Sequence, residues 1–168
     1  MKPIEQFSLG LVDAEKQTAE LMDLSGRKVT TLDGVVLEAQ FLVTGGGYLV
    51  VTSDEDPFEG CLHMCLLDDK FKKIDGMRLG VSYRPGTFRA HGHGPGESLQ
   101  FSFFADEIWH LEIAPRSRLV LIRPLGPVRY TSPFYKGHRL SLRSTTSHIP
   151  AIDPRRDTRG LVVLKKSE

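Results

Sequence analysis

The chain has 168 residues and a formal net charge of +1; 40% of its residues are hydrophobic and 26% are charged. This composition is typical of a globular domain large enough to bury its own core, and it argues against wholesale disorder. No apolar run approaches the ~18 residues of a membrane-spanning helix, and the first residues do not form a secretory signal. We therefore expect a cytoplasmic protein that does not enter a membrane.

Charge is spread unevenly along the chain. Residues 1–60 contain 11 acidic and 4 basic side chains, whereas residues 136–168 contain 3 acidic and 8 basic ones. Such asymmetry indicates either an anionic partner or two complementary ends of one domain. We favour the second interpretation, because no five like charges follow one another.

The first half of the chain is dominated by patterns typical of strands. One short helix is expected near residues 13–22, where Asp13 could cap a run of helix-forming residues. Asp33-Gly34 is a strong hairpin signal, and a break at residues 45–47 precedes the β-prone run of residues 48–53. Residues 61–83 repeat the pattern, with turns expected at Asp68-Asp69 and at Asp75-Gly76.

The acidic segment of residues 52–60 contains Asp54, Glu55, Asp56 and Glu59. Four carboxylates in a loop can attract a calcium ion, but the spacing of an EF-hand is absent. We interpret the segment as a solvated loop whose charge could attract a basic protein partner.

Two cysteines follow, Cys61 and Cys65, with His63 between them. In a strand the two thiols would lie about 13 Å apart, which is too far for a disulfide. No second cysteine pair completes a zinc site. The segment is therefore expected to be a half-buried strand with two reduced thiols, and with Leu62, Met64 and Leu66 on the opposite face.

The segment RPGTFRAHGHGPGE, residues 84–97, places two histidines and a carboxylate close together. In a strand, His91 and His93 would share one face, and Glu97 would add an oxygen ligand. The segment resembles part of the first motif of the cupin family, with Pro85-Gly86 before the histidines. The resemblance implies a small β-barrel enzyme with a divalent transition metal held by His91, His93 and Glu97, and by His138 or His110.

The alternative to this metal site is a glycine-rich loop with incidental histidines. Gly92 and Gly94 alternate with the histidines and favour a turn over the rigid backbone that metal ligands need. We prefer this alternative and expect no cofactor.

The strand-rich pattern continues to the end of the chain. Residues 98–104 and 108–115 read as strands around a turn at residues 105–107, and further short strands are expected at residues 118–124, 127–132, 138–144 and 160–166. Alternation in residues 138–144 places Arg139, Ser141 and Arg143 on one face and Leu140 and Leu142 on the other. The two arginines could contact an anionic surface, but no RNA-binding motif or phosphate loop is present, so we do not expect a nucleic-acid partner.

Turn signals every 8–12 residues predict a mainly β protein, an antiparallel β-sandwich or barrel built from successive hairpins. We expect a single domain over residues 1–144, followed by a loop or tail over residues 145–168 with a possible last strand at 160–166.

Because the sequence contains no complete catalytic set, our leading hypothesis is a non-catalytic domain that binds another macromolecule, preferably a protein, in the manner of an inhibitor, an immunity protein or an adaptor. The candidate contact residues are the four acidic residues of the loop together with Arg139 and Arg143. The alternatives are the cupin-like metal enzyme and a β-barrel carrier of a small apolar ligand, with Phe101, Phe103, Phe104 and Trp109 lining or filling its interior.

Overall fold

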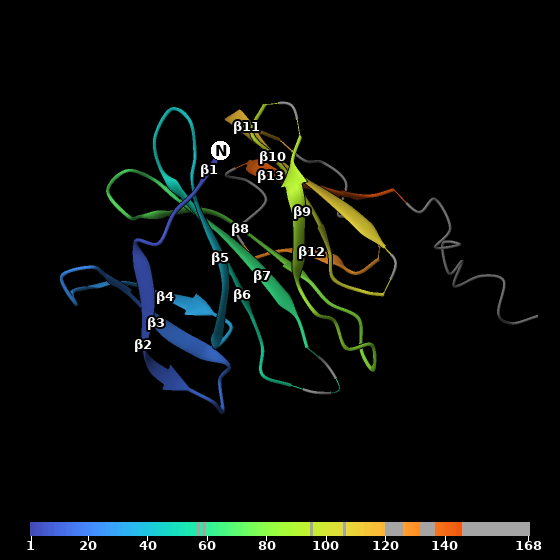
Figure 1. Ribbon diagram of the computed structural model, residues 1–168, viewed down its shortest axis with the longest axis horizontal. Helices are drawn as coiled ribbons and strands as arrows, with labels where there is room; N and C mark the ends of the chain where they lie inside the picture. The colour runs from blue at the N-terminus through green and yellow to red at the C-terminus, as the bar shows by residue number, and fades with distance from the viewer. Residues whose placement is uncertain are drawn as a thin grey trace, which may run out of the picture.

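The computed structural model describes residues 1–56, 58, 60–94, 96–105, 107–119, 126–131 and 137–145. Over these ranges the chain is mainly β and antiparallel, as the sequence predicts, and no helix occurs among the described residues. The strands form three sheets (Figure 1). The described part of the chain therefore contains no helix that could cross a membrane.

The largest sheet has six strands and lies in the middle of the molecule (Figure 1). In spatial order its strands are β1 (Lys2–Pro3), β5 (Val36–Leu42), β6 (Tyr48–Ser53), β7 (Leu62–Leu67), β8 (Lys73–Leu79) and β12 (Val128–Tyr130).

Two smaller sheets accompany it. The four-stranded sheet has the order β13 (His138–Ser144), β11 (Ile108–Arg118), β10 (Ser98–Ser102) and β9 (Arg89–His93). The three-stranded sheet consists of β2 (Phe7–Asp13), β3 (Thr18–Asp23) and β4 (Lys28–Asp33).

The six-stranded sheet is buried on both faces. Alternate residues of β7 belong to two different cores: Met64 and Leu66 pack in a cluster with residues of the four-stranded sheet, whereas Cys65 and Leu67 pack in a cluster with residues of the three-stranded sheet. The predicted division of the side chains of β7 between two faces is therefore correct. The strand was expected to be buried on one face, but both of its faces are buried. Burial raises the pKa of the Cys65 thiol to about 12, and Cys61 and Cys65 do not form a disulfide.

The short helix considered for residues 13–22 does not form. These residues are the end of β2, a tight turn and most of β3. Asp13 does accept a hydrogen bond from the backbone N–H of Lys16, at 3.1 Å, as a helix cap would. The apolar residues behind it, Ala19 and Leu21, are buried with a period of two, so packing selects the strand.

The expected hairpin at Asp33-Gly34 is a crossing between two sheets. β4 pairs with β3, whereas β5 pairs with β6, so the strands on either side of Gly34 are not partners. Gly34 has a φ of 88°, and a Cβ atom there would lie 2.8 Å from Oγ1 of Thr52. This position therefore requires glycine for two reasons: its φ is positive, and β6 approaches too closely for a side chain.

The turn expected at Asp75-Gly76 is also wrong, because both residues lie inside β8. Its pairs with β7 include Cys65 with Gly76 and Leu66 with Asp75. A side chain at Gly76 would collide with Oγ1 of Thr131, the residue that follows β12. Close packing, rather than a turn, explains the glycine at this position.

The other expectations for the later strands are confirmed where the chain is described. Residues 48–53 and 138–144 form β6 and β13, and β5, β7 and β10 are joined to β6, β8 and β11 as antiparallel neighbours. The strand expected at residues 118–124 falls largely outside the described residues. The tail and the last strand predicted over residues 145–168 lie outside them almost entirely.

Two bulges interrupt the four-stranded sheet. In β9 the pairing with β10 jumps from Gly92 opposite Gln100 to Ala90 opposite Phe101. Between β11 and β13 the pairing jumps from Ile113 opposite Leu140 to Arg118 opposite His138. The second bulge is the larger one, because four residues of β11 lie opposite a single residue of β13.

Candidate functional site

The bulge in β9 separates the two histidines of the predicted metal site. His93 lies opposite Leu99, and Ala90 lies opposite Phe101, so both are on the face of the sheet that carries these buried residues, although β9 itself is exposed. The intervening His91 shares one register position with Gly92, whose φ of 146° departs from a regular strand. His91 and His93 consequently lie on opposite faces, although the sequence pattern placed them on one.

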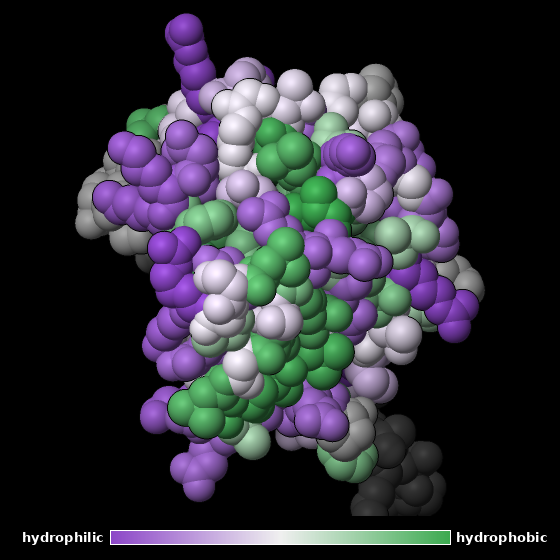
Figure 2. Space-filling model, turned by 60° about the vertical axis from the view of Figure 1, so that its left-hand side comes forward, coloured by the Kyte–Doolittle hydropathy of each residue, from purple (hydrophilic) through white to green (hydrophobic). Residues whose placement is uncertain are grey.

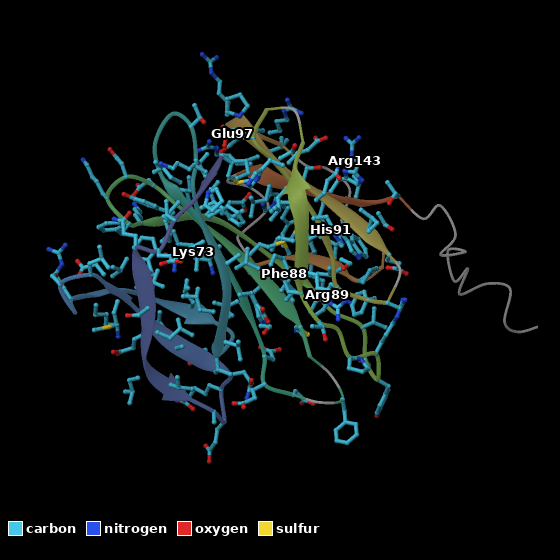
Figure 3. All side chains as sticks on the ribbon, viewed as in Figure 1. Lys73, Phe88, Arg89, His91, Glu97 and Arg143 are labelled. Carbon is cyan, nitrogen blue, oxygen red and sulfur yellow. The ribbon has the colours of Figure 1, made fainter. Side chains whose placement is uncertain are left out.

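The other two expected ligands lie apart from this pair. Glu97 follows the β9–β10 turn, away from His91 along the sheet (Figure 3). His138 lies on β13, at the opposite edge of the sheet from β9, about 14 Å away at three strand spacings. His110, the other candidate for the fourth ligand, lies on β11, between those two edges.

The structure therefore does not assemble the metal site that the cupin resemblance implies. Within the described ranges, no three His, Cys, Asp or Glu side chains lie close enough to hold one metal ion.

His138 instead forms a buried pair with Asp75, which no motif indicated. Nδ1 of His138 lies 2.9 Å from Oδ1 of Asp75, and neither side chain is more than 1% exposed. Asp75 also accepts hydrogen bonds from the backbone N–H groups of Gly76, Arg139 and Leu140, at 2.7–2.9 Å. Both carboxylate oxygens thus act as acceptors, so Nδ1 of His138 is the proton donor of the pair.

Tyr130 fixes the other side of the imidazole. Its ring stacks on that of His138 with centroids 3.6 Å apart, and its hydroxyl donates to the carbonyl oxygen of Leu140 at 3.1 Å. Burial, together with the negative charge of Asp75, raises the pKa of Tyr130. Strands β8, β12 and β13 therefore hold one polar cluster at the junction of two sheets.

A pocket of about 380 Å³ opens beside this cluster, where β11 bulges away from β13. Among the residues that line it are Glu97, Glu112, Arg118, Tyr130, His138 and Arg139. Nε2 of His138 is buried and has no hydrogen-bond partner within the described part of the chain. This is the most clearly built polar site that the structure describes.

The acidic loop is less open than the sequence suggests. Asp54 lies 2.7 Å from Nε2 of His63, and both side chains are only 12% exposed. Glu55 and Asp56 are exposed, and Glu59 lies outside the described residues. Of the three carboxylates that the structure describes in the loop, Glu55 and Asp56 are therefore exposed, while Asp54 is held against β7.

The two arginines of β13 differ from each other. Arg143 is exposed, as predicted, on the outer face of the four-stranded sheet. Arg139 is partly buried, and its Nε donates to the carbonyl oxygen of Ala114 at 2.8 Å. Arg139 thereby belongs to the pocket at the β11 bulge, whereas Arg143 is free to meet a partner from solvent (Figure 3).

A second hollow, of about 400 Å³, lies between the edges of the two larger sheets. β5 and the residues before β2 form one wall, and β9 with Leu99 forms the other. We call it the edge groove. It is lined by Pro3, Ile4, Glu5, Leu37, Glu38, Ala39, Gln40, Phe41, Ala90, Gly92, His93 and Leu99.

The aromatic side chains considered for an apolar ligand fill the interior. Phe101, Phe103, Phe104 and Trp109 are at most 2% exposed and belong to the core between the six- and four-stranded sheets. They pack edge-to-face against one another, for example Phe103 against Phe104 with centroids 4.8 Å apart.

Comparison with known proteins adds no assignment. No family model, no curated protein and no solved structure matches the chain.

Sequence reasoning missed Asp75, because Asp-Gly resembles a turn, and missed Tyr130 and the edge groove, because each depends on strands that are distant in sequence. The signal that could have indicated the groove is the apolar content of residues 36–42 beside the exposed residues 89–93.

Proposed function

We propose that the protein binds another protein in the edge groove, as a non-catalytic cytoplasmic interaction domain. The observation that carries the proposal is an apolar groove between two sheet edges, one of which, β9, is exposed along its whole length. Specific binding sites combine apolar walls with a few polar groups at their rim, and the groove has this composition.

Exposed apolar side chains also occur outside the groove. Figure 2 shows a band of hydrophobic side chains on the side of the molecule where the three-stranded sheet and β5 come forward. Exposed large apolar residues in these regions include Leu11, which is 74% exposed, and Val12, Val36 and Leu42. Exposed apolar surface of this kind is typical of protein–protein contacts, because binding removes it from water.

The proposed occupant is an extended segment of the partner. β9 is the last strand of its sheet, and its outer edge pairs with no strand in the described ranges. Unpaired N–H and C=O groups on such an edge can accept an added strand, and the groove beside them can take its alternate side chains.

The charge of β9 further restricts the kind of segment that can bind beside it. β9 carries Arg89, His91 and His93 and has no carboxylate. A segment that alternates apolar and acidic residues would place the apolar side chains in the groove and the acidic ones on the opposite face, beside Arg89 and His91. None of the six residues chosen from the sequence as protein contacts lines this groove.

The test uses a displayed library of random short peptides selected on the full chain. We expect enrichment of peptides that alternate apolar and acidic residues. His91→Glu, on the face that meets the acidic residues, should weaken binding of a selected peptide at least about tenfold, since it repels them. His91→Ala is the matched control, because it removes the same imidazole without adding a negative charge, and it should weaken binding only about twofold.

Backbone amide signals of β9 should shift on peptide addition if the segment adds to this edge. Failure to enrich the alternating pattern, or equal loss of affinity in the two variants, would contradict the proposal. The control that both variants remain folded is an unchanged thermal unfolding midpoint, which is expected because His91 is exposed.

A further inference from the structure

The pocket at the β11 bulge is separate from the edge groove and has its own chemistry. It exists because β11 and β13 part between Ile113 and Arg118, which leaves a cavity where a regular ladder would be filled. Bulges of this kind are often found beside functional sites, where they redirect side chains.

Two buried atoms of the residues that line this pocket lack partners. Nε2 of His138 and Oε2 of Glu97 make no hydrogen bond within the described ranges, although each is shielded from solvent. Leaving such atoms unpaired costs free energy, so a ligand that supplies their partners would be stabilised in the pocket.

Both atoms are hydrogen-bond acceptors. In the neutral imidazole of His138 the proton lies on Nδ1, where Asp75 accepts it, which leaves a lone pair on Nε2. Oε1 of Glu97 accepts from the amino group of Met1 at 2.9 Å, and Thr44 also hydrogen-bonds this side chain, so Glu97 is placed as a carboxylate whose Oε2 can accept a further bond. The ligand must therefore donate at two positions.

The charges of the lining decide which donor is favoured. Two carboxylates, Glu97 and Glu112, are balanced by two guanidinium groups, Arg118 and Arg139. These charges cancel, so the lining does not favour a net charge on the ligand, whereas hydroxyl groups can donate to the acceptors and accept from the arginines. Ser98 and Ser141 add hydroxyl groups of their own to the lining.

We propose that this pocket binds a small neutral polyhydroxylated molecule, a polyol or a monosaccharide. Its hydroxyl groups donate to Nε2 of His138 and to the carboxylate of Glu97 and accept from Arg139. A volume of about 380 Å³ lies at the lower end of the range of small-molecule sites, which suits a ligand of this size.

The test follows the ring nitrogens of His138 by NMR in the full-length protein labelled with ¹⁵N-histidine. Glycerol, myo-inositol and D-glucose are the probes, each added to tens of millimolar. We expect Nδ1 to carry the proton before addition, and Nε2 to shift saturably with at least one probe. Ethanolamine and zinc chloride are the contrasting probes for a cationic ligand and for a metal.

Glu97→Gln should weaken binding of the responding probe about tenfold, because one acceptor is replaced by an amide that presents a donor. Glu15→Gln, in the exposed turn between β2 and β3, is the matched control and should leave the affinity unchanged. A thermal unfolding curve of each variant checks that the fold is retained.

Three outcomes would overturn the proposal. The first is a proton on Nε2 instead of Nδ1, which would remove the acceptor. The second is a saturable shift with ethanolamine or zinc but with none of the three polyols. The third is an Nε2 that does not respond to any polyol, which would leave bound water as its partner.

Discussion

The four-stranded sheet has one bulge in its edge strand β9 and another between β11 and β13, and each lies beside a histidine. In β9 the extra residue is His91 itself, which lies exposed and separated from His93. In the second bulge the extra residues belong to β11, and the opposite strand holds His138 against Asp75. A histidine that is itself the extra residue of a bulge is thus exposed, whereas a histidine on the strand opposite the extra residues is held in a polar cluster.

The largest expected effect comes from the buried pair. Asp75→Ala removes the acceptor of three backbone N–H groups and one imidazole, so the free energy of unfolding should fall by about 3–5 kcal/mol. Urea unfolding measures the loss. Asp54→Ala, at the less deeply buried pair with His63, is the matched control and should cost about 1 kcal/mol. Equal losses would show that the Asp75 cluster is not specially stabilising.

Glycines at the two bulges allow a second comparison. Gly137 has a φ of 69°, and a Cβ atom there would lie 3.1 Å from the carbonyl oxygen of Arg118. Gly137→Ala should lower the free energy of unfolding by about 2 kcal/mol. Gly92→Ala should cost about 1 kcal/mol, because a Cβ atom would meet nothing within 4 Å and the exposed edge strand can adjust. A larger loss of unfolding free energy for Gly92→Ala than for Gly137→Ala would contradict this prediction.

Ionisation of Tyr130 gives a smaller effect that is specific to the β11 side. Its pKa is raised, so a titration followed at 295 nm should contain a component above the ordinary tyrosine range, and Tyr130→Phe should remove it. The unfolded state loses its proton at a lower pH than the folded state. Stability from this group is therefore complete below the unfolded pKa and declines as the pH rises from about 10.

His91→Ala should have the smallest effect. The side chain is exposed, so we expect a change in unfolding free energy below about 0.5 kcal/mol in urea. A loss above 1 kcal/mol would indicate that His91 stabilises its bulge through contacts that burial and register do not explain.

Local pattern was sufficient to predict much of the fold. Leu140 and Leu142 alternate with Arg139, Ser141 and Arg143, and this period of two predicts β13 with its correct bounds. Asp33-Gly34 and Asp75-Gly76 show where the same reasoning fails. Both pairs have the residue types of a turn. However, Asp33-Gly34 connects strands of two different sheets, and Gly76 lies in a strand against Thr131. Neither arrangement can be recognised from the neighbouring sequence.

The candidate site was less predictable than the fold. Asp75 and His138 are separated by 63 positions in the chain and meet only because β8 and β13 approach each other in the folded protein. His91 and His93 were conspicuous because they are neighbours in sequence, but a single extra residue in β9 turns them apart. Proximity in sequence was therefore a poor guide to proximity in space for these histidines.

Because the six-stranded sheet is packed on both faces, its central strands should accept few amino-acid substitutions during evolution. In β6 and β7 nearly every side chain is buried against one of the two neighbouring layers. A substitution there must therefore fit the side chains of that layer. Their amide protons should be among the last to exchange with deuterated water. Variation between descendants of this chain should accordingly gather in β2 and β9, where half or more of each strand meets solvent.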